Sequence, residues 1–181
     1  MRPAATICAA FGLVLLFLAG LFAGEARAAR SCAGAAVVQS ASRSFMAAAR
    51  RGSPGAFSRA LSRHVHLRRL ALFALGRYRR KLSPAQRRAY LRLLPAYVAR
   101  KLSRYAGGFG GGSVEVVKCR RNVVETRLRP GGGRVLWRLS GRRIVDVNIR
   151  NMWLGLLLRD HVRDLIRRAG GDMRAFLARL R

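Results

Sequence analysis

The chain has 181 residues, 51% of them hydrophobic and 24% charged, so it can bury a core and is not a disordered polycation. This length suits one domain of ordinary size. The charge is extreme, because 37 Lys and Arg residues stand against 7 Asp and Glu residues, giving a formal net charge of +30. Such a charge favours anionic partners, and the few scattered carboxylates argue against paired-carboxylate catalysis.

The first residues have the pattern of a secretory signal peptide. A short basic start, Met1-Arg2, precedes an almost wholly apolar run over 7–22, and Ala26-Arg27-Ala28 has the small-x-small pattern of a cleavage site. We therefore expect a signal peptide over 1–28 and a single exported domain over 29–181. An uncleaved membrane anchor is the alternative, although the apolar run is short for a span of about 20 residues. Export argues against nucleic acid as the main partner.

Cleavage after Ala28 would leave two cysteines, Cys32 and Cys119. In an oxidising compartment these two could form one disulfide between the mature N-terminus and a strand near the middle of the chain. Two free buried thiols are the alternative, and the sequence leaves both open. The spacing of the cysteines does not fit a metal site.

Helices are predicted over the first half of the mature chain. The alanine-rich stretch 33–50 predicts the first helix. Ser53 is a suitable N-cap for a short second helix, with proline at its first position, that runs to about Leu61. A third helix is predicted over 65–75, and Gly76 follows it.

The fourth predicted helix has the clearest start signal. Ser83 and Gln86 have the spacing of a capping box, with Pro84 at the first helical position. Apolar residues then follow helical spacing to about Tyr105. Pro95 interrupts this pattern and is expected to kink the helix.

Four strands are predicted over 113–119, 123–129, 134–139 and 143–149, and short turns between them imply an antiparallel meander. In the last strand, period-2 alternation puts one apolar set on one face and a mixed set on the other: Val145, Val147 and Ile149 on the first, Ile144, Asp146 and Asn148 on the second.

A helix over 153–168 and a short one after Asp172 end the chain. The order predicts an α+β fold in which an antiparallel four-stranded meander sheet packs against several helices, with an apolar cavity between the layers.

No catalytic set emerges from the motifs. The pair His64 and His66 resembles a metal motif, but no third ligand is obvious and arginines surround it, so we interpret it as an exposed pair. The glycine-rich run 107–112 lacks the ending of a phosphate loop and is interpreted as a connector. We therefore predict a protein that is not an enzyme and needs neither a metal nor another cofactor.

Several segments together resemble a known family. The stretch 74–87 carries a glycine, an aromatic residue, basic residues and then Ser-Pro-x-Gln-Arg. The stretch 91–105 is a helix that ends in tyrosine before glycine, and 141–147 is a strand that contains Asp146-Val147. Leu154, Arg159 and Gly170 follow in order. This series resembles the MlaC, or toluene-tolerance, family of periplasmic phospholipid-binding proteins.

The resemblance implies a periplasmic lipid carrier without enzymatic activity. Such a protein would hold phospholipid acyl tails between helices and sheet, and would shuttle lipid between an outer-membrane lipoprotein complex and an inner-membrane ABC transporter complex, contributing to outer-membrane lipid asymmetry. The sequence does not distinguish phospholipid from a hopanoid or another lipid. Anionic membrane surfaces are a further expected partner, because each basic residue near them contributes about 1 kcal/mol.

The candidate lipid-binding residues are apolar and lie on the predicted inner faces; ordinary core packing is the alternative for each one: Leu94, Val98, Leu102, Val135, Trp137, Val145, Val147, Trp153 and Leu157. Arg77, Arg79 and Arg80 are candidates for head-group or partner docking. We also expect Asp146 to pair with Arg159 as a structural tie.

Two rival functions stay open from the sequence. One is a ligand-free basic adaptor that docks on a transporter, which a tightly packed interior would support. The other is a basic nucleic-acid-binding module, which an uncleaved cytoplasmic product would support.

Overall fold

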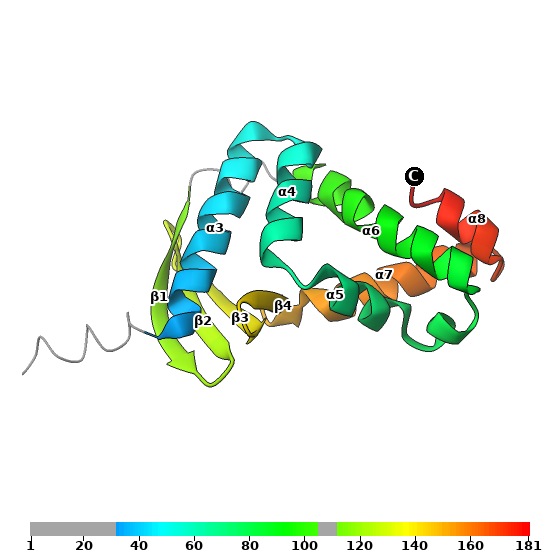
Figure 1. Ribbon diagram of the computed structural model, residues 1–181. Helices are drawn as coiled ribbons and strands as arrows, with labels where there is room; N and C mark the ends of the chain where they lie inside the picture. The colour runs from blue at the N-terminus through cyan, green and yellow to red at the C-terminus, as the bar shows by residue number, and fades with distance from the viewer. Residues whose placement is uncertain (1–31, 105–111) are drawn as a thin grey trace, which may run out of the picture.

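The computed structural model describes residues 32–104 and 112–181, so the predicted signal peptide over 1–28 and all of the glycine-rich connector except Gly112 lie outside the described residues. One group of helices precedes an antiparallel meander of strands, and a second group follows it (Figure 1). In chain order they are α3 (Ala33–Arg51), α4 (Pro54–His64), α5 (Leu67–Leu75), the 3-10 helix η1 (Gly76–Arg80), α6 (Pro84–Arg104), β1 (Ser113–Arg120), β2 (Val123–Arg129), β3 (Arg134–Ser140), β4 (Arg143–Ile149), β5 (Met152–Trp153), α7 (Leu154–Arg168) and α8 (Met173–Ala178).

The helix starts confirm the capping signals in the sequence. The Ser53 hydroxyl accepts a hydrogen bond from the Ala56 amide at the start of α4. At α6, the Ser83 amide donates to the Gln86 side chain over 2.9 Å, and the Gln86 amide donates back to the Ser83 hydroxyl over 3.2 Å. These reciprocal bonds are a capping box. The helix α6 then continues through Pro95 to Arg104.

The third helix begins two residues later than predicted. Val65 forms a parallel bridge with Ile144, and the His66 amide donates to the Ile144 carbonyl over 2.8 Å. The backbone groups of these residues therefore form hydrogen bonds with β4 instead of within a helix. The helix ends as predicted at Gly76, whose φ of 52° lies in the left-handed region that favours glycine.

The sheet is an antiparallel meander in the order β1-β2-β3-β4-β5, so the α+β prediction is confirmed with one strand more than expected. The extra strand is β5, where Trp153 pairs with Asn148 and Met152 pairs with Ile149. A two-residue turn, Arg150-Asn151, joins it to β4, and both turn residues have positive φ. The predicted start of the last helix at Trp153 was therefore wrong by one residue.

The predicted alternation of β4 is broken by a bulge. Leu139 opposes Ile144 and Arg138 opposes Asp146, so Val145 is the unpaired extra residue between them. Because Leu139 is buried under the helices, Ile144 shares the inner face with Val147 and Ile149, and Val145 does not. The prediction that Val145 shares the face of Val147 was wrong for this reason.

Two clusters of buried side chains form the core. The first, which we call the interlayer core, lies between the sheet and the helices α3, α4 and the end of α6. The second, the helical core, joins α5, α6, α7 and α8. Figure 1 shows the resulting elongated molecule, with the sheet and α3 at one end and α6, α7 and α8 at the other.

A disulfide joins Cys32, immediately before α3, to Cys119 in β1, across 87 residues of sequence. It ties the N-terminal helix to the edge strand of the sheet. The structure thus adopts the first of the two alternatives that the sequence left open.

We predict that replacing both cysteines by serine will lower the free energy of unfolding by about 2–5 kcal/mol, because the bond restricts a long loop in the unfolded chain. Guanidinium denaturation of the mature protein with and without reductant measures this. Equal midpoints in oxidising and reducing buffer would contradict the prediction, and the double-serine variant should no longer respond to reductant.

Candidate functional site

Five of the nine predicted lipid-binding residues belong to the interlayer core or pack against it. Val135 and Trp137 of β3 are buried in it, at 2% and 8% exposure. Val98 and Leu102 of α6 and Val147 of β4 are half-buried against it. Leu94 lies one turn before Val98 on the same helix, but its side chain belongs to the helical core. The structure therefore brings residues from the fourth helix and the last two long strands to one apolar layer.

Three other predicted wall residues lie elsewhere. Val145 is at the bulge of β4. Trp153 opposes Asn148, which in turn opposes Leu136, so it lies on the outer face of the sheet. Leu157 is 43% exposed on α7. The bulge displaces Val145, the unexpected strand β5 places Trp153 on the outer face, and the orientation of α7 exposes Leu157. None of these three residues therefore lines the layer.

The polar groups inside the interlayer core have partners within the protein. The Trp137 indole donates to the Thr126 hydroxyl over 2.8 Å, and Thr126 is fully buried. His64 and the Ser44 hydroxyl are hydrogen-bonded over 2.9 Å. Within 32–104 and 112–181, every buried side-chain nitrogen or oxygen atom is hydrogen-bonded. A ligand in this layer would therefore meet apolar surface and not polar groups in need of a partner.

Two histidines are held in environments that disfavour their charged form. Burial, followed by the neighbouring Arg63 cation, lowers the pKa of His64. Burial also lowers the pKa of His161, which is hydrogen-bonded to the Tyr97 hydroxyl between α7 and α6. Lys101 and Arg168 lower it further, while Asp164 acts in the opposite direction.

The surface of the described residues includes two hollows. One, of about 780 Å³, is on the outer face of the sheet and has basic and apolar walls that include Lys118, Arg120, Arg121, Glu125, Arg134 and Leu136. The other, of about 570 Å³, lies at the sheet edge between α3 and the start of β1, beside Met46 and Val114. Six of the nine side chains predicted to line an internal cavity belong to the two cores or pack against them.

Asp146 has a different role from the predicted pairing with Arg159. Its carboxylate accepts a hydrogen bond from the Gly155 amide over 2.9 Å, in the first turn of α7. A Cβ atom on Gly155 would lie 3.0 Å from that carboxylate, so the close approach suits glycine. The Arg159 guanidinium instead lies over the Phe73 ring, 5.5 Å from its centroid. Asp146 thus caps α7 from β4 and ties the sheet to the helix.

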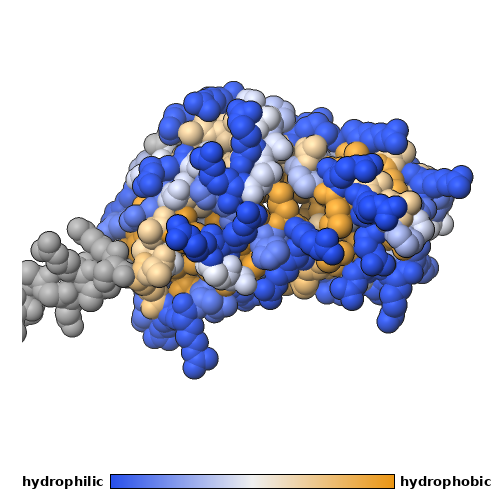
Figure 2. All heavy atoms as spheres, in the orientation of Figure 1, coloured by the Kyte–Doolittle hydropathy of each residue, from blue (hydrophilic) through white to orange (hydrophobic). Residues whose placement is uncertain are grey.

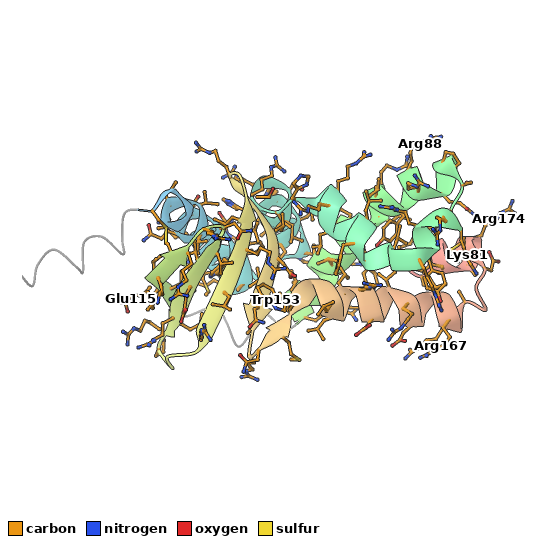
Figure 3. The ribbon with its side chains drawn as sticks, turned by 90° about the horizontal axis from the view of Figure 1, so that it is seen from below. Lys81, Arg88, Glu115, Trp153, Arg167 and Arg174 are labelled. Carbon is orange, nitrogen blue, oxygen red and sulfur yellow. A yellow bond between two sulfur atoms is a disulfide. The ribbon has the colours of Figure 1, made fainter. Side chains whose placement is uncertain are left out.

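The predicted docking arginines lie far from the interlayer core. Arg77, Arg79 and Arg80 belong to η1, which connects α5 to α6 at the helical end of the molecule (Figure 1). The Arg77 guanidinium lies 5.3 Å from the centroid of the Tyr78 ring, and its hydrogen bond to the phenol lowers the pKa of Tyr78. Figure 3 shows that Lys81, Arg88, Arg167 and Arg174 lie at this same end. These cations therefore form a basic end that is separate from the apolar layer.

Each carboxylate of the described residues has a local partner. None is therefore left to neutralise the many remaining basic side chains. Four of them form ion pairs: Glu115 with Arg129, Glu125 with Arg134, Asp160 with Arg163, and Asp164 with Arg167. The other two, Asp146 and Asp172, accept hydrogen bonds from amides at the starts of α7 and α8. Figure 2 accordingly shows hydrophilic side chains projecting over most of one face, with apolar groups between them.

The described residues contain neither a cluster of metal-ligating side chains nor a helix able to span a bilayer. In 32–104 and 112–181, no three His, Cys, Asp or Glu side chains come together in a group that could hold a metal ion. The helices of that same part of the chain are all too short or too polar to cross a bilayer.

Comparison with known proteins decides the family. The sequence matches the family described as MlaC protein over residues 38–181. The chain belongs to the MlaC family. No curated protein matches the sequence. The phospholipid-binding protein from Ralstonia solanacearum, solved in complex with a phospholipid, has a similar structure, with a TM-score of 0.65 at 16% identity over 82% of this chain and 95% of that chain. The family predicted from the sequence is thus confirmed, and the fold is shared with a solved structure.

Sequence reasoning missed two features of this MlaC-family chain. It did not find β5, because a two-residue strand has no periodicity of its own. It also did not find that Asp146 caps α7, since the two elements are separate in sequence. A signal for the second was available: Gly155 in the first turn of an otherwise leucine-rich helix indicates a close approach by another group.

We predict that Asp146→Ala will destabilise the protein by about 1 kcal/mol, because it removes both the acceptor and the negative charge at the start of α7. Asp146→Asn, which keeps an acceptor, should cost less. Urea denaturation of both variants and of Arg159→Ala measures these effects. If Asp146 and Arg159 were coupled, the double variant would be less destabilised than the sum of the single ones; the structure predicts additivity.

We predict that the free energy of unfolding falls as the pH is lowered from about 7 to about 5. Both His64 and His161 have a lowered pKa in the folded state, so the unfolded chain takes up protons first and gains stability as the pH falls. Thermal unfolding of the wild type and of His64→Gln with His161→Gln across this range tests the idea. The double variant should show a flatter dependence, and equal slopes would refute the assignment.

Proposed function

We propose that this chain is a periplasmic lipid carrier that binds phospholipid acyl tails against its interlayer core and moves lipid between membrane complexes. Its partners would be an outer-membrane lipoprotein complex and an inner-membrane ABC transporter complex. Membership of the MlaC family and the similarity to a phospholipid-bound structure support this proposal. Export through the predicted signal peptide over 1–28 would bring the single domain over 29–181 to the periplasm.

The observation that carries the proposal is the apolar layer between the sheet and the helices. Its walls come from α3, α4, α6 and the inner face of the sheet, and its few polar groups are already hydrogen-bonded. Acyl tails need only such a surface, because each buried CH₂ group contributes about 0.8 kcal/mol. Affinity of this kind requires neither a metal nor a catalytic residue.

Entry of tails requires movement, because the side chains of the interlayer core pack against one another. Among the residues that the structure describes, Val98 packs against both cores. Residues near the end of α6, such as Leu102, are half-buried. Moving them would expose the layer at a lower free-energy cost than moving fully buried residues would. We infer that tails enter by separating the end of α6 from the sheet.

The packed interior is also the specific observation that favours the second candidate, a ligand-free basic adaptor that docks on a transporter. The basic end around Arg77, Arg79 and Arg80 would then be the contact surface for acidic partners. The two candidates differ in one measurable property, which is whether the purified protein holds lipid.

We predict that the mature protein from a periplasmic fraction carries lipid at near-equal stoichiometry, and that Leu102→Trp reduces this occupancy at least about threefold by filling the layer. Native mass spectrometry followed by lipid extraction measures occupancy and identifies the cargo, including the distinction between phospholipid and a hopanoid.

Leu91→Trp is the matched control, because Leu91 is half-buried on the same helix but packs against the helical core. It should retain wild-type occupancy. A wild-type protein that is empty, and stays empty after incubation with vesicles, would overturn the carrier proposal in favour of the adaptor. Equal loss in both variants would show that the effect comes from stability and not from the layer.

A further inference from the structure

Exposed apolar side chains are concentrated where the sheet passes into α7. Among the described residues, six large hydrophobic side chains are exposed, and four of them lie in the six-residue segment 152–157: Met152 at 51%, Leu154 at 37%, Leu156 at 48% and Leu157 at 43%. The other two are Phe73 and Val117. Exposed apolar groups concentrated in one short segment commonly mark a binding surface.

Helix geometry places two of these leucines away from the core. The buried residues of α7 are Gly155, Val162 and Ile166, which lie on one face. At about 100° per residue, Leu157 lies about 160° from the centre of this face, on the opposite side of the helix, and Leu156 lies about 100° from it, at the flank. Neither side chain packs in the helical core, and both are directed outward.

The segment is held in place by neighbouring contacts. Asp146 caps α7 through the Gly155 amide, and Trp153 is paired in the sheet with Asn148. Figure 3 shows Trp153 at this junction, where the sheet meets the start of α7. The apolar residues are thus presented on a rigid corner between a strand and a helix.

Basic side chains accompany the apolar ones. The Arg138 guanidinium lies 4.0 Å from the centroid of the Trp153 ring, and Arg150 occupies the exposed turn that leads into Met152. The carboxylates further along the exposed side of α7, Asp160 and Asp164, are each paired with an arginine. The surroundings of the patch are therefore apolar and cationic.

We propose that residues 152–157 form an interfacial docking segment that inserts into the head-group region of an anionic bilayer. Tryptophan and leucine partition into this region, and arginines beside them attract anionic lipid. The patch projects from a corner and lines neither of the two hollows, which suits a bilayer because a bilayer offers no preformed complementary shape. This inference deepens the proposed function, since it names the surface with which a carrier would approach membranes. It rests on the proposed function only for the reason why the protein would approach a membrane.

The test is co-sedimentation of the mature protein with vesicles of phosphatidylcholine alone and of phosphatidylcholine with phosphatidylglycerol. We expect binding to the anionic vesicles, with a blue shift of Trp153 fluorescence; Trp137 is already buried and should change little. Leu156→Ser with Leu157→Ser should weaken partitioning at least about tenfold. Val117→Ser is the matched control, because Val117 is 39% exposed at the bulge of β1, outside the segment.

The outcomes separate this inference from the proposed function. Two results would overturn the docking segment: vesicle binding by the double variant as strong as that of wild type, or an unshifted Trp153 fluorescence spectrum. Charge alone would then explain any vesicle binding, and contact with a protein partner would explain the exposed patch. Circular dichroism thermal unfolding is the folding control, and the double variant should unfold near the wild-type temperature because both positions are exposed. Lipid occupancy by native mass spectrometry should be unchanged in the double variant, so failure of carriage and failure of docking appear in different measurements.

Discussion

The structure depends on covering one face of an antiparallel sheet. The inner faces of β1 to β4 carry buried apolar residues, which must be removed from water by the helices above them. Helix α3 lies close to this face: a Cβ atom on Gly34 would come within 2.8 Å of Val124 and 2.9 Å of Leu139. The disulfide from Cys32 to Cys119 holds the start of the same helix against the sheet. The positions of α4 and the end of α6 follow, because they complete the cover.

The second half of the molecule is built on helices alone, and α6 connects the two parts. Its early residues Tyr90 and Leu94 belong to the helical core, and the Tyr90 hydroxyl donates to the Ala71 carbonyl over 3.1 Å. Its end belongs to the interlayer core. The helical core thus anchors α6 at one end while the other end borders the apolar layer. In the proposed carrier, this arrangement would let the end of α6 move away from the sheet while the helical core keeps the rest of the helix in place.

The charge and the apolar patch divide the surface into regions with different uses. The arginines of η1 lie at the helical end, while the exposed segment 152–157 lies at the corner between sheet and α7. Since every described carboxylate is paired or caps a helix, the arginines dominate the field around the molecule. Long-range attraction would bring the protein to anionic surfaces, and the apolar corner would determine its orientation there.

The sequence by itself determined the family, the order of the elements and the helix starts, because capping boxes, turns and strand alternation are local patterns that require only neighbours along the chain. It also identified Val135, Trp137, Val98 and Leu102 as residues near the apolar layer. Only the tertiary structure decided which face of β4 is buried, that Trp153 and Leu157 lie outside the layer, and that Asp146 caps α7 instead of pairing with Arg159. The reason is physical: one unpaired residue at Val145 reverses the alternation of a strand, and a cap from a separate element depends on distances that no local pattern encodes.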